Sequence, residues 1–332
     1  MNSDVVDGVP IGTPVLLIIF KRPELTRRVL QAIAAVRPRV LLVAADGPRS
    51  ADEKVLCDAT REILRDVNWP CEVRTNFANL NLGCGVRVYT AVDWAMSQYE
   101  RLIVLEDDCV PDPTFFSFCE RLLDHYENDN RVMHIGGFNF QPSDFRIEYS
   151  YFFSKYTIAS GGFATWRRAW RHYDWSLSMW KSIRNVGFVE SFCGDPYEQR
   201  YWKEIGDRMS YGAKDVWDYQ WNLSCWTQNG LAILPSVHLL MNIGFGDAAT
   251  HTKESIPCLT VPMGKITNIT HPPLVFSNYQ ADHFIFHKNF GGEAMKLSDS
   301  KSVRIRRRLR PFFWPLRVAR KLWQLVRAQL RH

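Results

Sequence analysis

The sequence predicts an α/β fold in which a mixed, mostly parallel sheet is flanked by helices. Short apolar runs alternate with helical patterns over residues 1–135, and this alternation implies parallel strands joined by right-handed crossovers. One apolar run, Leu102–Leu105, ends abruptly in Glu106, Asp107 and Asp108. Ligands of open α/β sheets bind at the carboxyl ends of the strands, so these three residues mark a predicted site.

The first half of the chain consists of successive strand and helix patterns. Val15–Phe20 and Val40–Ala45 are apolar runs of strand length, and apolar residues recur between them at helical spacing. This arrangement predicts a β-α-β unit. Further along we expect a helix over 51–67, a strand over 71–77, a glycine turn over 79–85 and a helix over 86–99.

The pattern is looser after Gly136 and Gly137. Tyr151–Phe153 is strand-like, and a second apolar run includes Ile233 and Leu234. Between these runs, a glycine turn over 160–163 is expected to enter a Trp-rich helix that contains Trp166 and Trp170.

The net charge of +6 comes from the C-terminal segment. Residues 301–332 contain eleven Lys or Arg and no acidic residue, whereas residues 1–300 have a net charge of −5. The body of the chain therefore gives no reason to expect nucleic-acid binding. Leu316, Trp323 and Leu330 share the apolar face of a basic helical pattern, which is typical of an interfacial membrane anchor. Packing of this helix on its own domain, or nucleic-acid contact, is the alternative.

The cysteine pattern favours a reducing compartment. The eight cysteines form no C-x-x-C pair, which gives no indication of a zinc or redox motif. We expect free thiols in the cytosol. The first apolar run is much shorter than the roughly 20 residues that span a bilayer, and no N-terminal signal or anchor is visible.

Charged residues at three strand ends indicate a nucleotide site. The acidic triplet would suit Mg²⁺ or Mn²⁺ carrying a nucleotide diphosphate, because hard cations prefer carboxylate and phosphate oxygens. Arg22 follows the first strand, next to a helix start that attracts phosphate. Asp46 ends the second strand and could accept a hydrogen bond from a base N–H. The alternatives are a solvated acidic turn, a solvated basic turn and ordinary turn chemistry.

Two later segments complete the candidate site. Trp217 and Asp218 place an aromatic ring beside a carboxylate, as sugar binding needs, although they could also lie on a helix that packs on the core. Asp215 is the rival candidate for a catalytic base. The glycine-rich loop over 242–251 could close over a diphosphate, and its His251 could contact phosphate or metal or be a bystander. His238 is expected to be structural.

The order of these motifs resembles a known family. Over residues 13–255 the chain is similar to metal-dependent GT-A glycosyltransferases, specifically N-acetylglucosaminyltransferase I and its bacterial relatives. The resemblance rests on the Arg-containing loop and helix (22–28), the strand that ends in Asp46, and the acidic triplet with Pro111–Phe116 after it. The Gly-Gly-Phe turn with its Trp helix, and Trp217-Asp218, complete it.

The resemblance implies a role for each matching residue. Asp108 would bind Mn²⁺ or Mg²⁺, and Glu106 and Asp107 would hold the sugar and ribose of the donor. The remaining roles are Arg22 on the diphosphate, Asp46 on the uracil, Asp218 as general base, Trp217 on the acceptor and His251 on the phosphate or metal. Residues 1–135 would then form the nucleotide-sugar-binding half of a GT-A domain, 136–300 the acceptor-binding half, and 301–332 a basic amphipathic tail.

These roles predict an inverting glycosyltransferase. It would move a sugar, GlcNAc by resemblance, from a UDP-sugar to a glycan or lipid-linked glycan in bacterial surface polysaccharide assembly. Its tail would bind the anionic inner face of the cytoplasmic membrane. One alternative is a sugar-nucleotide pyrophosphorylase, but the loop Phe20–Pro23 lacks the glycines which that class needs. The other is a non-catalytic carbohydrate-binding membrane scaffold.

Overall fold

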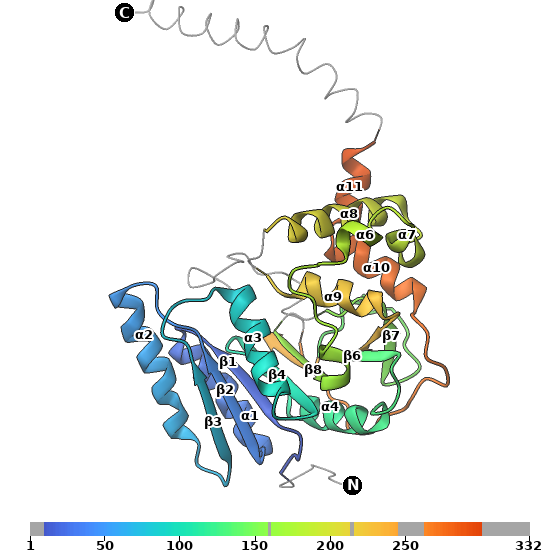
Figure 1. Ribbon diagram of the computed structural model, residues 1–332. Helices are drawn as coiled ribbons and strands as arrows, with labels where there is room; N and C mark the ends of the chain where they lie inside the picture. Colours follow the sequence, from blue (N-terminus) through green and yellow to red (C-terminus); the bar gives the residue numbers. More distant parts are fainter. Residues whose placement is uncertain (1–9, 159–160, 213–215, 245–261, 301–332) are drawn as a thin grey trace, which may run out of the picture.

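The computed structural model describes residues 10–158, 161–212, 216–244 and 262–300 (Figure 1). One sheet of eight strands runs through this part of the chain in the order β3-β2-β1-β4-β8-β6-β9-β7. The strands are β1 (Val15–Ile19), β2 (Val40–Ala45), β3 (Glu72–Phe77), β4 (Arg101–Glu106), β6 (Val132–Gly136), β7 (Tyr151–Ser154), β8 (Gly162–Trp166) and β9 (Leu231–Pro235).

The sheet is mixed, and most of its strand pairs are parallel. β3, β2, β1 and β4 pair in parallel, as do β6 and β9. β8 runs antiparallel between β4 and β6, and β7 runs antiparallel to β9. A separate two-stranded sheet joins β5 (Cys109–Pro111) to β10 (Leu240–Asn242). The predicted α/β fold class, a mostly parallel sheet flanked by helices, is confirmed.

Helices cover both faces of the sheet (Figure 1). The longer ones are α1 (Pro23–Val36), α2 (Ala51–Glu62), α3 (Cys84–Met96), α4 (Pro113–His125), α8 (Pro196–Ser210), α9 (Asp218–Thr227) and α10 (Tyr279–Asn289). The shorter ones are a 3₁₀ turn η1 (Ile63–Asp66), α5 (Arg167–Trp170), α6 (Trp180–Ile183), α7 (Phe188–Phe192) and α11 (Gly292–Ser298).

The core forms two hydrophobic clusters, and β1 shows how the sheet divides them. Leu17 belongs to the cluster that contains the apolar residues of α1 and α4, whereas Leu16 belongs to the cluster with those of α3. Every residue of β1 is buried. A strand covered on both faces is apolar throughout, which is why the first strands were visible as uninterrupted apolar runs.

The predicted Trp-rich helix after the glycine turn includes Trp170, which ends α5, but the prediction was wrong for Trp166. Trp166 does not lie on a helix: it ends β8, and the helix that follows, α5, has only four residues. Gly162–Trp166 is buried between β4 and β6, so its backbone groups are satisfied by pairing with both neighbours.

The cysteines and the helix lengths bear on two further predictions. The seven cysteines that the structure describes are free thiols, as expected. In the described ranges, helices are too short or too polar to cross a bilayer. The predicted amphipathic helix of residues 301–332 lies outside the described residues.

Candidate active site

The acidic turn (Glu106, Asp107 and Asp108) connects β4 to β5. Glu106 is the last residue of β4, and its backbone N–H donates to the Gly161 carbonyl at 2.7 Å. The carbonyl of Asp108 accepts from the N–H of Ile243 at 2.8 Å. The turn is therefore held on both sides by backbone, at the carboxyl end of a central strand, where the sequence predicted the site.

Arg22 is the internal partner of the acidic turn. It lies at the N-cap of α1, directly after β1, and its Nη1 is 2.7 Å from Asp108 Oδ2 and 3.5 Å from Asp107 Oδ1. The other oxygen of Asp107 accepts from the backbone N–H of Phe20 at 3.1 Å. Two of the predicted strand ends, those of β1 and β4, thus meet at one place.

The acidic turn carries more negative charge than Arg22 offsets. Burial, and after it the neighbouring carboxylates, raises the pKa of Glu106 to about 8. Burial and the charge of Asp108 raise the pKa of Asp107 to about 7, although Arg22 acts in the opposite direction. Like charges held close together disfavour ionisation of both groups. The turn would therefore be stabilised by a further cation.

At two glycines the backbone lies so close to this turn that a side chain would not fit. A Cβ built on Gly244 would lie 2.0 Å from Asp108 Oδ2, and one built on Gly161 would lie 2.3 Å from the Cys109 sulfur. Gly161 also has a φ of +93°, a conformation that favours glycine. The donor set here is carboxylate oxygen, which suits a hard divalent cation such as Mg²⁺ or Mn²⁺. Asp108 and Asp107 are the residues that would hold it.

Asp218 lies near the acidic turn, although it belongs to the second half of the chain. It is the first residue of α9 and is partly buried, and its charge contributes to the raised pKa of Glu106. The neighbouring Trp217 donates a side-chain hydrogen bond to Glu106. The structure therefore places Asp218 beside the acidic turn, although the two are more than 100 residues apart in the sequence.

Trp217 is a buried residue in this structure. Only 4% of it is exposed, and its ring lies 5.2 Å from that of Phe163. This leaves little of the ring for a sugar to stack on, so the helix-packing alternative describes its surroundings better than an open platform does. The aromatic residue holds Glu106, while the role expected for it on the acceptor stays a prediction.

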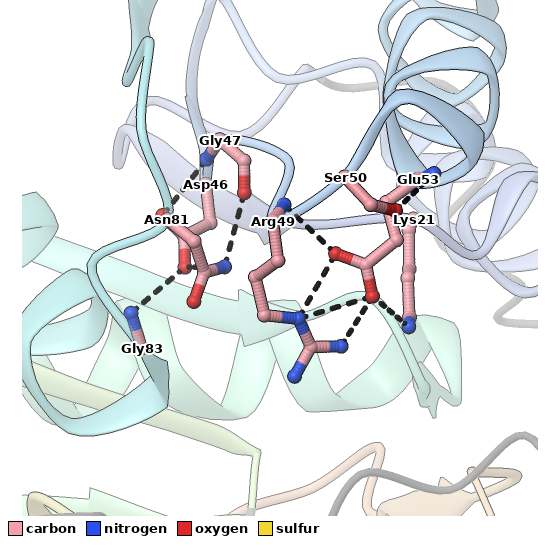
Figure 2. A network of polar contacts seen from close by, with 8 residues as sticks. All are labelled: Lys21, Asp46, Gly47, Arg49, Ser50, Glu53, Asn81 and Gly83. Carbon is pink, nitrogen blue, oxygen red and sulfur yellow. Dashed lines mark hydrogen bonds and ion pairs between the residues drawn. The ribbon is translucent and has the colours of Figure 1, made fainter.

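Asp46 organises the loop before α3, as Figure 2 shows. Its Oδ1 accepts from the N–H groups of Gly47 and Leu82, both at 2.8 Å. Its Oδ2 accepts from the Asn81 side chain at 2.9 Å and the Gly83 N–H at 3.1 Å. An ionised carboxylate has about four acceptor positions, so binding of a base N–H would have to replace one of these bonds. The uracil contact expected for Asp46 stays a prediction.

A second network in Figure 2 fixes the cations next to Arg22. Glu53 accepts from Lys21 at 2.6 Å and from the side chain and backbone of Arg49. These bonds, first those from Arg49 and then that from Lys21, lower the pKa of Glu53 well below its usual range. The positive charge of the loop after β1 is thus held at the edge of the site.

The remaining candidate residues are His251, Asp215 and His238. His251 and Asp215 lie outside the described residues. His238 is 5% exposed, and burial lowers its pKa to about 4, which agrees with the structural role expected of it. Gly161 and Gly244 lie in glycine-rich segments, over 160–163 and 242–251, that are visible in the sequence, but their contacts at the turn are not.

Comparisons with known proteins give only distant likenesses. No family model matches the sequence, and no curated protein does. Among solved structures, the chain is similar to S. aureus TarS 1–349 at 11% identity and a TM-score of 0.33, covering 52% of this chain and 50% of that one. It therefore spans about half the length of that TarS fragment.

Two other solved structures give similar values. The 4-diphosphocytidyl-2C-methyl-D-erythritol synthase of Anaerococcus prevotii has 9% identity and a TM-score of 0.29, covering 47% of this chain and 71% of that one. HddC of Yersinia pseudotuberculosis has 11% identity and a TM-score of 0.30, covering 47% and 77%. Likenesses this weak carry no functional argument, and the function has to be argued from the residues themselves.

Proposed function

We propose that the chain is a metal-dependent, inverting glycosyltransferase that uses a UDP-sugar. The observation that supports it most is the convergence of Arg22, the acidic turn and Asp218 at the carboxyl edge of one sheet. These residues come from the end of β1, the end of β4 and the start of α9. The set provides a cation for a diphosphate, carboxylates for a divalent metal and a further carboxylate for proton transfer.

Each residue has a distinct task in the proposed reaction. Arg22 would exchange Asp108 for the donor's diphosphate, which a guanidinium binds with two parallel hydrogen bonds. Asp108 and Asp107 would hold Mn²⁺ or Mg²⁺, which would neutralise negative charge on the leaving diphosphate. Glu106 and Asp107 would also orient the sugar and ribose of the donor.

Asp218 is proposed as the general base. It would take the proton of the acceptor hydroxyl as that oxygen bonds to the anomeric carbon. The bond from this carbon to the UDP oxygen would break, and its electron pair would leave with UDP. Attack from the face opposite UDP inverts the anomeric centre. GlcNAc is the sugar that the family resemblance favours, and the acceptor is proposed to be a glycan or a lipid-linked glycan.

Thermal shift with a nucleotide panel tests this function directly. A ligand that binds only the folded state raises the melting temperature, so UDP or UDP-GlcNAc should stabilise the chain in Mn²⁺ and not in chelator. Asp108→Asn should abolish this metal-dependent shift. Asp58→Asn is a matched control, because it removes a half-exposed carboxylate that pairs with Lys54 on α2.

The outcomes separate the competing functions. No shift with any nucleotide would contradict the proposal and favour the scaffold. Pyrophosphate release from a nucleoside triphosphate and a sugar phosphate would favour the pyrophosphorylase. Release of UDP from UDP-GlcNAc, with no pyrophosphate, would support the glycosyltransferase.

We also propose that residues 301–332 bind the anionic inner face of the cytoplasmic membrane. The eleven basic residues of this segment support the idea, since each Lys or Arg near such a surface contributes about 1 kcal/mol. Deletion of 301–332 should release the chain from anionic vesicles in a sedimentation assay and leave UDP release intact. A truncated chain that still sediments with vesicles would contradict this assignment.

A further inference from the structure

A second group of metal-ligating side chains lies in the other half of the molecule. Asp195 precedes α8, and His283 and His287 lie one turn apart on α10. One ligand atom from each can be chosen so that all three lie within 4.8 Å of one another. We call these residues the Asp–His cluster. α8, α10 and α11 gather away from β3 (Figure 1), so the cluster is separate from the nucleotide-binding strands.

The carboxylate of Asp195 is already oriented for a ligand. Its Oδ1 caps α8 by accepting from the Tyr197 N–H at 2.7 Å. This bond leaves Oδ2 directed at the imidazole of His287, whose Nε2 is 3.2 Å away. Zinc–ligand bonds of about 2.0–2.1 Å in a tetrahedron separate neighbouring ligand atoms by about 3.3 Å. The observed spacing therefore already matches one edge of a zinc site.

A side-chain cation lies between these ligands. The Lys296 Nζ is 3.1 Å from His287 Nε2 and 3.2 Å from Asp195 Oδ2. The Lys296 side chain is 43% exposed, so its flexible stem can carry the ammonium into solvent. Within the described residues, His287 Nδ1 is buried without a hydrogen-bond partner. The ring is therefore fixed by packing and by the contacts of Nε2 alone.

His283 supplies the third ligand. It is exposed, and its ring lies 4.2 Å from the ring of His287. Because its side chain is not enclosed, a rotamer change can bring it to a bound ion without disturbing the core. The set of two imidazoles and one carboxylate leaves a fourth position for water or another ligand.

We propose that the Asp–His cluster is a zinc site that joins α8 to α10, with Lys296 displaced when the ion binds. Imidazole is a borderline ligand that suits Zn²⁺, whereas the all-oxygen donors of the acidic turn suit Mg²⁺ or Mn²⁺. The two sites thus select different ions. This inference does not depend on the proposed glycosyltransferase activity.

Equilibrium dialysis of the tag-free full chain against Zn²⁺ tests the site. One ion should bind per chain, and Asp108→Asn should leave that binding unchanged. His283→Ala and Asp195→Asn should each weaken it at least tenfold; asparagine at 195 keeps the helix cap, and His283 is exposed, so both variants should fold. His125→Ala is the matched control, since it removes an exposed ring from a different pair of neighbouring His rings, His125–His271.

A variant that is expected to bind Zn²⁺ more tightly provides a second test. Lys296→Met removes the competing ammonium and should tighten Zn²⁺ binding about tenfold. Binding that is lost in Asp108→Asn, or that His283→Ala and Asp195→Asn leave unchanged, would overturn the proposal. So would a Lys296→Met chain that binds Zn²⁺ no more tightly than the natural sequence.

Discussion

The acidic turn and the Asp–His cluster both hold a side-chain cation, but they hold it differently. Arg22 is 12% exposed and bonds to Asp108 at the carboxyl ends of β1 and β4. Lys296 is 43% exposed and reaches its partners from the short helix α11. A guanidinium keeps its charge and binds carboxylates in a fixed geometry, whereas an ammonium on a flexible stem is easily exchanged. In the proposals above, Arg22 therefore keeps its position and exchanges Asp108 for the donor's diphosphate, whereas Lys296 moves into solvent when an ion binds.

Substitution of the proposed general base tests whether the chemistry is confined to the region of the acidic turn. Asp218→Asn should lower UDP release from UDP-GlcNAc by about 10²- to 10⁴-fold, because a positioned general base contributes that much. Donor binding by thermal shift, and Zn²⁺ binding at the Asp–His cluster, should be unchanged. Turnover that survives this substitution would assign the base to another group, with Asp215 as the first candidate.

Removing each cation in turn measures how much each region depends on it. Arg22→Met leaves carboxylates buried without their partner and should lower the free energy of unfolding by about 3 kcal/mol. Lys296→Met removes a more exposed ion pair and should cost less than about 1 kcal/mol. Urea unfolding in the presence of chelator measures both, and Mn²⁺ should recover part of the loss only in Arg22→Met. Equal losses of unfolding free energy in the two variants would show that the two regions depend on their cations to the same extent.

A pH dependence is also expected for the acidic turn. The pKa of Glu106 is about 8 in the folded chain against an ordinary value of 4.5, so between these values the folded state binds a proton that the unfolded state has released. Stability therefore falls as pH rises through this window. Glu106→Gln, which still accepts the Trp217 hydrogen bond, should lose less stability between pH 5 and pH 8 in chelator. The free energy of unfolding is measured by urea at both pH values. An equal fall between pH 5 and pH 8 in the two chains would contradict the raised pKa.

The sequence was sufficient for the parallel strands β1 to β4 and insufficient for the antiparallel centre of the sheet. Buried parallel strands such as β1 are continuous apolar runs, which are recognisable without knowing their neighbours. β8 contains small residues and begins at a glycine turn, so only its pairing with β4 and β6 makes it a strand. β5 has three residues and is defined by a partner more than 100 residues away.

The site was predictable where charge follows a strand directly. The acidic turn and Arg22 were found in this way, because the topology brings the ends of β1 and β4 together. Asp46 was found too, but its four hydrogen bonds within the loop could not be foreseen. The Asp–His cluster was missed: the four-residue spacing of His283 and His287 is visible, but its partner Asp195 is distant in the sequence and comes close only through helix packing.

The position of β8 also affects how the chain is made. Residues 162–166 are synthesised well after β4 and β6, yet they fill the space between those two strands. A nascent chain that stops near residue 135 would present the hydrogen-bonding edge of β4 without its neighbour, and exposed strand edges recruit other chains. On the ribosome, the N-terminal half can therefore complete its sheet only after β8 has emerged. A fragment expressed to isolate that half would need to extend through Trp166.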